Sequence, residues 1–251
     1  MTSEAIQKAV HALSDARHPI ALTGAGISVE SGIPDFRSAA GLWSKYSPEE
    51  YATIEAFHAD PHKVWTMLAE MVTLVTQAKP NPAHVGLANL EEMGKLHTVI
   101  TQNIDGLHQV AGSHHVIEFH GSTASLSCLS CGYMTGRDTV SVEQLPPTCP
   151  RCHSILKPDV VFFGEPIPWD AHQAAMEAAR TCDLLLVIGT SAMVYPAAAI
   201  PPTAKDCGAK VIEINLEPTP LTHHVSDLIV KGSSGEILPG MVKELRRLTH
   251  P

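Results

Sequence analysis

Four short apolar runs, each ending in small or polar residues, govern how this 251-residue chain can fold. The runs cover residues 18–23, 98–101, 184–188 and 211–215. Helical spacing of apolar residues marks the stretches between and before them, at 4–17, 84–93 and 170–181. Continuous apolar strands that alternate with helices are typical of a parallel sheet covered on both faces. The sequence therefore predicts a Rossmann-like α/β fold with helices on both faces of its sheet.

Two regions do not follow this alternation. Residues 40–80 carry no strand signal and contain a helical pattern at 61–78, and residues 122–156 are rich in Cys, Pro, Ser and Thr. We expect both to form a smaller domain over the carboxyl edge of the sheet, where open α/β folds bind ligands. The larger, Rossmann-like domain would then comprise 1–39, 81–121 and 157–251, and the smaller one the helical insertion 40–80 and the cysteine-rich insertion 122–156.

Charge and hydropathy restrict the partners and the compartment. The net charge of −9 at pH 7 argues against a basic face for direct nucleic-acid binding. It is compatible with cationic peptide partners, although an acidic surface also serves solubility alone. The longest apolar run, residues 184–188, is too short to span a bilayer, and Glu4 stands where a signal peptide would be basic and then apolar. We expect a cytoplasmic protein without a membrane segment.

Four of the six cysteines form two CxxC pairs. Cys128 and Cys131 are followed, after seventeen residues, by Cys149 and Cys152. In a reducing compartment this spacing favours a metal over disulfides. Four thiolates close a tetrahedron around one zinc ion and leave no position for a substrate. The sequence therefore predicts that residues 122–156 are a zinc ribbon, whose metal is structural.

Glycines follow the first predicted strand, in the segment 24–28 (GAGIS). Such glycines let backbone N–H groups approach a pyrophosphate, but the third glycine of GxGxxG is missing and a tight turn explains the pair equally well. The next segment, 34–37 (PDFR), combines a rigid turn, an acid, a ring and a cation. A surface loop with an ion pair is the alternative interpretation.

Polar side chains also follow the second strand. Segment 101–105 (TQNID) offers amide and carboxylate partners for ribose hydroxyls and a carboxamide, or alternatively a helix start capped by Asn103 or Asp105. Farther on, His120 comes after residues 116–119 and could take a proton from a hydroxyl, because an imidazole titrates near neutrality. With fifteen histidines in the chain, a structural or exposed residue is the competing interpretation.

Three later segments complete the pattern. Residues 157–165 (KPDVVFFGE) predict either an extended edge that pairs with a peptide or an ordinary sheet strand. Residues 189–191 (GTS) follow the most apolar run and lead to 194–196 (VYP), and Asn215 ends the next run. These positions place further hydroxyl and amide groups at the same predicted edge.

Taken together, these segments resemble the sirtuin family. GAGIS, GIPDFR, TQNID, HG, the paired CxxC, KPDVVFFGE, GTS with VYP, and IN occur in that family's order from residue 24 to 215. The chain has little beyond the family's core, which suggests a bacterial or archaeal member. The resemblance implies an NAD-dependent protein lysine deacylase. Such an enzyme consumes NAD and an acyl-lysine protein or peptide, and produces nicotinamide, O-acyl-ADP-ribose and free lysine.

The resemblance also implies a role for each matching residue. His120 would be the general base, and Asn103 would position water and contact ribose. The residues expected to hold NAD are Gly24, Ala25, Gly26, Ser28, Asp35, Phe36, Arg37, Gln102, Asn103, Ile104, Asp105, Gly189, Thr190, Ser191, Asn215 and Ser234. Those expected to hold the acyl peptide are Val160, Phe163, Gly164, Glu165, Val194, Tyr195, Leu68 and Met71. Leu68 and Met71 occupy the positions where desuccinylases of this family carry Tyr and Arg, so we expect apolar acyl groups to be preferred over succinyl and glutaryl.

Three other functions compete with this one. A mono-ADP-ribosyltransferase would share the pocket and the first cleavage, but an intact His120 beside a full peptide segment favours deacylation. A hydride-transferring dehydrogenase would usually show GxGxxG and an acid about twenty residues later, which the residues after Gly24 do not. A zinc-ribbon binding module would leave segment 101–105 and His120 unexplained.

Overall fold

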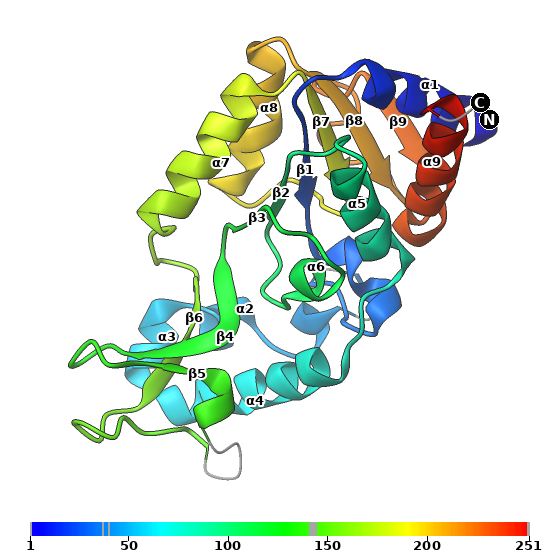
Figure 1. The fold of residues 1–251 in the computed structure, drawn as a ribbon. Helices are drawn as coiled ribbons and strands as arrows, with labels where there is room; N and C mark the ends of the chain where they lie inside the picture. Colours follow the sequence, from blue (N-terminus) through cyan, green and yellow to red (C-terminus); the bar gives the residue numbers. More distant parts are fainter. Residues whose placement is uncertain (1, 37, 40, 141–144, 250–251) are drawn as a thin grey trace.

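The computed structural model describes residues 2–36, 38–39, 41–140 and 145–249 of the chain. Its largest unit is a six-stranded parallel sheet in the order β3-β2-β1-β7-β8-β9 (Figure 1). The strands are β1 (Pro19–Thr23), β2 (Thr98–Thr101), β3 (Val116–Glu118), β7 (Leu184–Ile188), β8 (Lys210–Asn215) and β9 (Leu228–Lys231). All four apolar runs became strands, which confirms the predicted parallel sheet.

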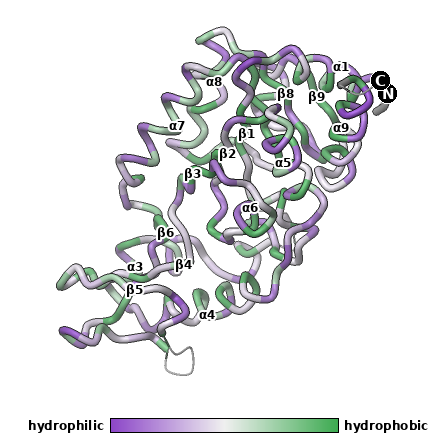
Figure 2. Tube along the Cα trace, viewed as in Figure 1, coloured by the Kyte–Doolittle hydropathy of each residue, from purple (hydrophilic) through white to green (hydrophobic). Residues whose placement is uncertain are grey.

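Helices cover both faces of this sheet (Figure 1). The helices packed on one face are α1 (Thr2–Asp15), α5 (Pro82–Glu92) and α9 (Ser234–Thr249). Those packed on the other face are α7 (Trp169–Thr181) and α8 (Ile200–Asp206). Figure 2 shows hydrophobic and hydrophilic residues alternating along α7. Within the described residues, no helix has the length and apolar content that crossing a bilayer requires.

The central strand β7 shows why the run is continuously apolar. Leu184 and Leu186 pack into the core under α1, α5 and α9, whereas Leu185 packs into the core under α7 and α8. Successive side chains of a strand point to opposite faces, so a strand with helices on both faces needs an apolar residue at every position. All five residues of β7 are accordingly buried.

A second, smaller unit lies beyond the carboxyl edge of the large sheet (Figure 1). Its helices are α2 (Pro48–Tyr51), α3 (Ile54–Ala59) and α4 (Pro61–Gln77), and its antiparallel sheet consists of β4 (Gly121–Cys128), β5 (Met134–Gly136) and β6 (Leu156–Val160) in the order β5-β4-β6. An apolar core of its own joins the helices to the sheet. We propose on this basis that it is a separate domain. The boundary expected at residue 157 falls inside β6.

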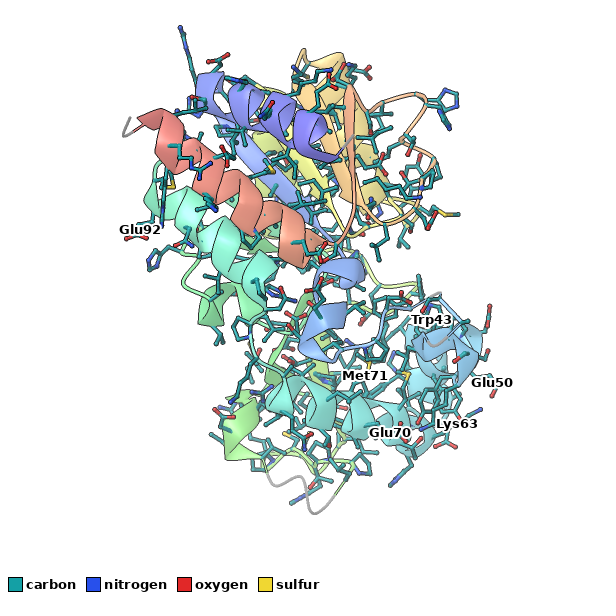
Figure 3. All side chains as sticks on the ribbon, turned by 90° about the vertical axis from the view of Figure 1, so that its right-hand side faces the viewer. Trp43, Glu50, Lys63, Glu70, Met71 and Glu92 are labelled. Atoms are coloured by element: carbon teal, nitrogen blue, oxygen red, sulfur yellow. The ribbon has the colours of Figure 1, made fainter. Side chains whose placement is uncertain are left out.

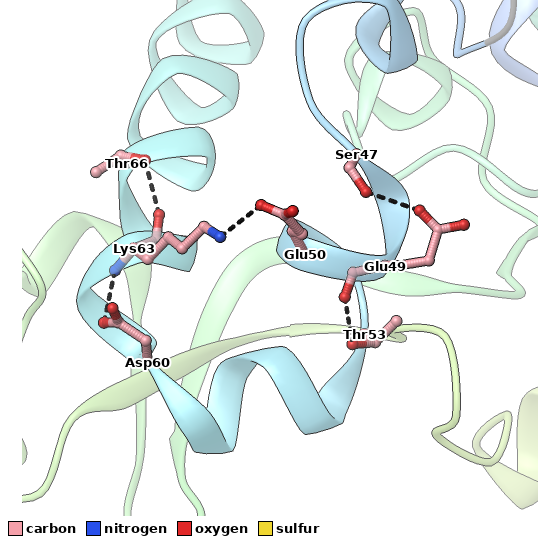
Figure 4. Close-up of polar contacts among 7 residues, drawn as sticks. All are labelled: Ser47, Glu49, Glu50, Thr53, Asp60, Lys63 and Thr66. Carbon is pink, nitrogen blue, oxygen red and sulfur yellow. Dashed lines mark hydrogen bonds and ion pairs between the residues drawn. The ribbon is translucent and has the colours of Figure 1, made fainter.

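Local capping explains where the helices of the insertion begin. The side chain of Thr53 accepts a hydrogen bond from the backbone of Ala56 at the start of α3. Asp60 accepts one from the backbone of Lys63 at the start of α4, as Figure 4 shows. Both are favoured N-cap residues because they satisfy otherwise unpaired N–H groups. The ammonium of Lys63 also pairs with Glu50 of α2 at 2.6 Å, which ties α2 to α4.

The remaining helical elements are single turns. They are α6 (Leu107–Val110), η1 (Ala25–Ile27), η2 (Val29–Ser31), η3 (Leu42–Ser44), η4 (Arg137–Thr139) and η5 (Ala197–Ala199). The turns η1 and η2 follow β1, and α6 follows β2. These turns carry the chain across the carboxyl edge of the sheet.

Candidate active site at the carboxyl edge of the sheet

Two loops touch where the neighbouring strands β1 and β7 end. The N–H of Gly26 donates to the carbonyl of Gly189 at 2.8 Å. A Cβ on Gly26 would lie 2.7 Å from that same oxygen, and one on Gly24 would lie 2.6 Å from the Cβ of Thr190. Real Cβ atoms do not approach so closely, so both positions require glycine. The GAG sequence is therefore explained by loop packing, which also leaves a surface of bare backbone at the edge.

The segments GAGIS and TQNID meet in one hydrogen-bonded cluster. The hydroxyl of Ser28 donates to Oδ2 of Asp105 at 2.7 Å and accepts from Nδ2 of Asn103 at 3.0 Å. The same Nδ2 donates to the carbonyl of Gly24 at 3.2 Å. Oδ1 of Asp105 accepts from the N–H of Leu107 at 3.0 Å, so this carboxylate also supports the start of α6. Ser28 and Asn103 are buried, and their polar atoms are thus held in fixed positions.

His120 is oriented by the backbone of the same segment. Its Nδ1 lies 3.0 Å from the carbonyl oxygen of Gln102. A carbonyl only accepts, so Nδ1 carries the hydrogen and Nε2 of the neutral ring keeps its lone pair. Burial lowers the pKa of His120 below its usual value, and the hydrogen bond to Gln102 offsets this in part. The ring is therefore neutral near pH 7, with Nε2 able to accept a proton.

The glycine after His120 has a steric explanation. Gly121 has φ +74°, and a Cβ there would lie 2.0 Å from the carbonyl oxygen of Asp159 in β6. β6 pairs with this stretch, since Gly121 lies opposite Val160 and the N–H of Val161 donates to the carbonyl of His120 at 2.8 Å. Because Gly121 has no side chain, β6 can pair with the chain directly after His120, and the small sheet begins at that point.

Other residues expected to bind NAD lie around these loops. The amide of Gln102 donates to the hydroxyl of Thr190 at 3.0 Å, and that of Asn215 donates to the carbonyl of Thr190 at 3.2 Å. The Phe36 ring lies 5.2 Å from the Trp43 ring, and Ile104, like both of them, packs against the small-domain core. The remaining positions follow the same edge: Ala25 is in η1, Asp35 accepts from the N–H of Ser38, Ser191 follows Thr190 and Ser234 begins α9. Arg37 lies outside the described residues.

The residues expected to bind a peptide fall into an exposed and a buried set. Phe163 and Tyr195 are 44% and 77% exposed, although the Phe163 backbone pairs with the segment between α2 and α3. Leu68 and Met71 of α4 pack instead in the small-domain core, and Figure 3 shows Met71 in that part of the molecule. Gly164 and Glu165 follow Phe163, Val160 ends β6, and Val194 precedes Tyr195.

Two buried histidines that the sequence analysis did not identify contact residues of the site. Nε2 of His84 lies 3.4 Å from the hydroxyl of Ser28, and Nε2 of His108 lies 3.0 Å from that of Thr23. Burial lowers the pKa of His84 to about 4 and that of His108 to about 3. Their rings contact each other edge-on at 4.9 Å. In the sequence only the helix start at Asn81, whose N–H donates to Nδ1 of His84, could have indicated one of them.

The four cysteines form the expected metal site. All four sulfur atoms lie within 4.8 Å of one another, with Cys128 and Cys152 at 3.4 Å and Cys131 and Cys149 at 3.6 Å. A tetrahedral zinc site with Zn–S bonds of about 2.3 Å has S···S edges of about 3.8 Å, so the donor set fits zinc. Cys128 ends β4, whose first residue, Gly121, follows His120, and the seven residue steps from Gly121 to Cys128 span roughly 20 Å. The metal site is thus structural and lies away from the histidine.

An open parallel α/β sheet, a polar cluster at its carboxyl edge and an inserted ribbon with four clustered cysteines define an α/β protein with a candidate structural zinc site. The model of the Sir2 family matches residues 24–196. That range covers more than half of the chain, and the chain belongs to the Sir2, or sirtuin, family. The resemblance seen in the sequence motifs is thereby confirmed.

Relatives match over almost the whole chain. A protein of Pyrobaculum aerophilum named NAD-dependent protein deacylase 2 is 50% identical over 235 residues, covering 94% of each chain. The solved structure of a Sir2 homolog–NAD complex is 42% identical, with a TM-score of 0.89 over 96% of this chain and 94% of that one. The structure of Sir2Af2 bound to a myristoylated histone peptide is 39% identical, with a TM-score of 0.83 over 98% of each chain.

Proposed function

We propose that this chain is an NAD-dependent protein lysine deacylase that converts NAD and an acyl-lysine peptide into nicotinamide, O-acyl-ADP-ribose and free lysine. One observation carries the proposal: His120 is held in the tautomer that leaves Nε2 free, next to the cluster formed by Ser28, Asn103 and Asp105. Relatives named NAD-dependent protein deacylase support the same reaction.

The carboxyl edge fits a dinucleotide. Glycines 24, 26 and 189 keep the β1 and β7 loops free of side chains, so backbone groups can approach a pyrophosphate. Nearby amides and hydroxyls, rather than charged groups, would hold the riboses. We assign NAD contacts to Gly24, Ala25, Gly26, Ser28, Asp35, Phe36, Gln102, Asn103, Ile104, Asp105, Gly189, Thr190, Ser191, Asn215 and Ser234, and keep Arg37 as a prediction from the sequence.

NAD supplies the electrophilic anomeric carbon, and the protein supplies the proton acceptor. We assign His120 Nε2 to accept a proton from a ribose hydroxyl, since the neutral ring presents its lone pair away from Gln102. Asn103, whose amide is fixed by Ser28 and Gly24, would orient the attacking water. The Phe36 ring, which packs beside Trp43, would exclude other water from the reacting carbon.

The peptide would lie as an extended strand between two segments. One comprises Val160, Phe163, Gly164 and Glu165, and the other Val194 and Tyr195; β-strand addition would give it main-chain hydrogen bonds. The acyl chain would enter the apolar small-domain core beside Leu68 and Met71. Neither residue can pair with a carboxylate, so we propose preference for acetyl to longer apolar acyl groups. The myristoylated peptide bound to Sir2Af2 supports this preference.

We propose a cytoplasmic location and no direct nucleic-acid partner. None of the six cysteines, all of which are described, forms a disulfide, which fits a reducing compartment. The net charge of −9 supports cationic rather than polyanionic partners. Because an acyl group passes to ADP-ribose and water enters, the chemistry is both acyl transfer and hydrolysis.

One product assay tests the proposal. The purified protein is incubated with an acetyl-lysine peptide and NAD, and the peptide, nicotinamide and protein masses are followed together. We expect nicotinamide and deacetylated peptide in equal amounts. ADP-ribose on protein without peptide deacetylation would indicate a mono-ADP-ribosyltransferase. NADH would indicate a dehydrogenase, and unchanged NAD a binding module.

A further inference from the structure

Lys157 of β6 is a buried lysine with every donor satisfied. Its residue is only 5% exposed. The ammonium donates to the carbonyl of Val160 at 2.7 Å and to that of Pro158 at 3.3 Å, and pairs with Oε2 of Glu165 at 2.9 Å. It also lies 4.5 Å from the centre of the Phe162 ring, within range of a cation–π contact. Three N–H donors thus have three acceptors.

All of these partners belong to one stretch of eight residues, 158–165. Oε2 of Glu165 also accepts from the N–H of Phe162 at 2.8 Å, and the N–H of Glu165 donates to the carbonyl of Phe162 at 3.0 Å. The turn between Phe162 and Glu165 is therefore folded around the Lys157–Glu165 charge pair. It contains Gly164, which adopts φ +88°.

This stretch also connects the two parts of the site. At one end, the N–H of Val161 donates to the carbonyl of His120. At the other, the N–H of Phe163 donates to Ala52, and its carbonyl accepts from Ile54. The backbone that would bind a peptide is thus hydrogen-bonded to His120 at one end and to the helical insertion at the other. The ammonium of Lys157 lies inside its turn and binds it there.

A buried charge pair is a poor way to gain stability alone. The free energy needed to remove two charges from water offsets much of the attraction between them. Apolar residues can therefore often replace such a pair without loss of stability. Lys157 is buried, and its ammonium lies over the ring of Phe162, which belongs to the apolar core of the small domain. Fixing one backbone geometry is a better-supported role for a buried charge pair than stabilising the fold.

We infer that Lys157 is a positioning residue for the acyl-peptide substrate, acting through the Glu165 carboxylate and the Val160 carbonyl to hold the 160–165 backbone in the shape that pairs with the peptide. The inference rests on the proposed function. It places Lys157 outside the NAD site, because none of its contacts is made to the β1 or β7 loops. Removal of its charge should therefore weaken peptide use and leave NAD use unchanged.

The test is steady-state kinetics of Lys157→Met with an acetyl-lysine peptide, varying peptide and NAD separately. We expect KM for the peptide to rise at least about tenfold, while KM for NAD and kcat stay within about threefold of wild type. Lys157→Arg keeps the cation and should recover part of the loss. The matched control is Lys205→Met, because Lys205 of α8 forms an ion pair with Asp227 away from the peptide segment; it should leave both KM values unchanged.

Equal rises in both KM values, or a peptide KM within about threefold of wild type in Lys157→Met, would overturn the inference. If Lys157→Met does not fold, Lys157→Gln decides, since it removes the charge and keeps an N–H donor inside the turn. A selective rise in peptide KM supports the inference, and unchanged peptide KM contradicts it. Wild-type protein that yields no free lysine would instead refute the proposed function, and this inference with it.

Discussion

Acid should unfold this protein through its two buried histidines. Burial lowers the pKa of His84 to about 4 and that of His108 to about 3, from a usual value of 6.5. In the unfolded chain both rings return to the usual value. Between pH 6.5 and about 4 the unfolded state therefore binds more protons than the folded state, and the free energy of unfolding falls as the pH falls.

The magnitude follows from the distance to pH 6.5. At pH 5 an unfolded histidine gains about 1.5 pKa units of protonation free energy that the buried ring cannot gain, which amounts to about 2 kcal/mol. The two residues together give about 4 kcal/mol, a large share of the roughly 5–15 kcal/mol by which a domain is stable. The effect levels off below about pH 4 for His84 and below about pH 3 for His108, where the folded rings also become charged.

Urea unfolding followed by circular dichroism at pH 5, 6 and 7 measures this loss. His108→Gln should remove about 2 kcal/mol of the difference between pH 7 and pH 5, even if its stability at pH 7 is lower. The zinc thiolates also take up protons in acid, but they do so in both proteins and cancel in the comparison. His97→Gln, at an exposed histidine, is the control and should keep the wild-type pH dependence. The same pH dependence in His108→Gln and wild type would refute the reasoning.

Three further predictions follow from the metal site, the His-Gly pair and the acyl pocket. Cys149→Ser should lose zinc and unfold at lower temperature, whereas wild type should carry about one zinc per chain by elemental analysis; a metal-free wild type contradicts this. Gly121→Ala should lower the free energy of unfolding by more than about 1 kcal/mol, and by more than Gly94→Ala, which has similar φ but no atom within 4 Å of a new Cβ. Equal losses would show that the approach of β6 is unimportant. Because Leu68 and Met71 are apolar, butyryl-lysine should exceed succinyl-lysine by at least about tenfold in kcat/KM, and the reverse order would be incompatible with the proposed pocket.

The main sheet could be predicted because its physical signal is local. A strand covered on both faces is apolar at most positions, and the run at β7 shows this most directly. β8 is an exception at Glu213, which is buried and accepts hydrogen bonds from Thr219, Thr222 and Ser226. The edge strand β9 was not predicted: its residues Leu228, Ile229 and Val230 are apolar, but only Val230 is buried. Helix α9 contains Pro239 and two glycines, which argue against a helix locally, yet its apolar face packs on α1 and α5.

The site was predictable as a set of motifs but not as a network. The order of GAGIS, TQNID and His-Gly indicated one family, and parallel strands bring their carboxyl ends to one edge. Apart from the helix start at Asn81 beside His84, nothing local marks His84 or His108 among fifteen histidines, because their roles depend on contacts with Ser28 and Thr23 across the fold. Likewise, the local sequence does not predict that the charge of Lys157 is buried, because lysines in strands are usually exposed.

The most direct test of the proposed reaction is the deacetylation rate of His120→Ala at saturating NAD and peptide. Because His120 is assigned as the proton acceptor, turnover should fall by roughly two to four orders of magnitude, while NAD still binds. His115→Ala, at an exposed histidine before β3, should keep the wild-type rate. A His120→Ala variant that retains more than about a tenth of wild-type turnover would contradict the assignment of His120 as the base.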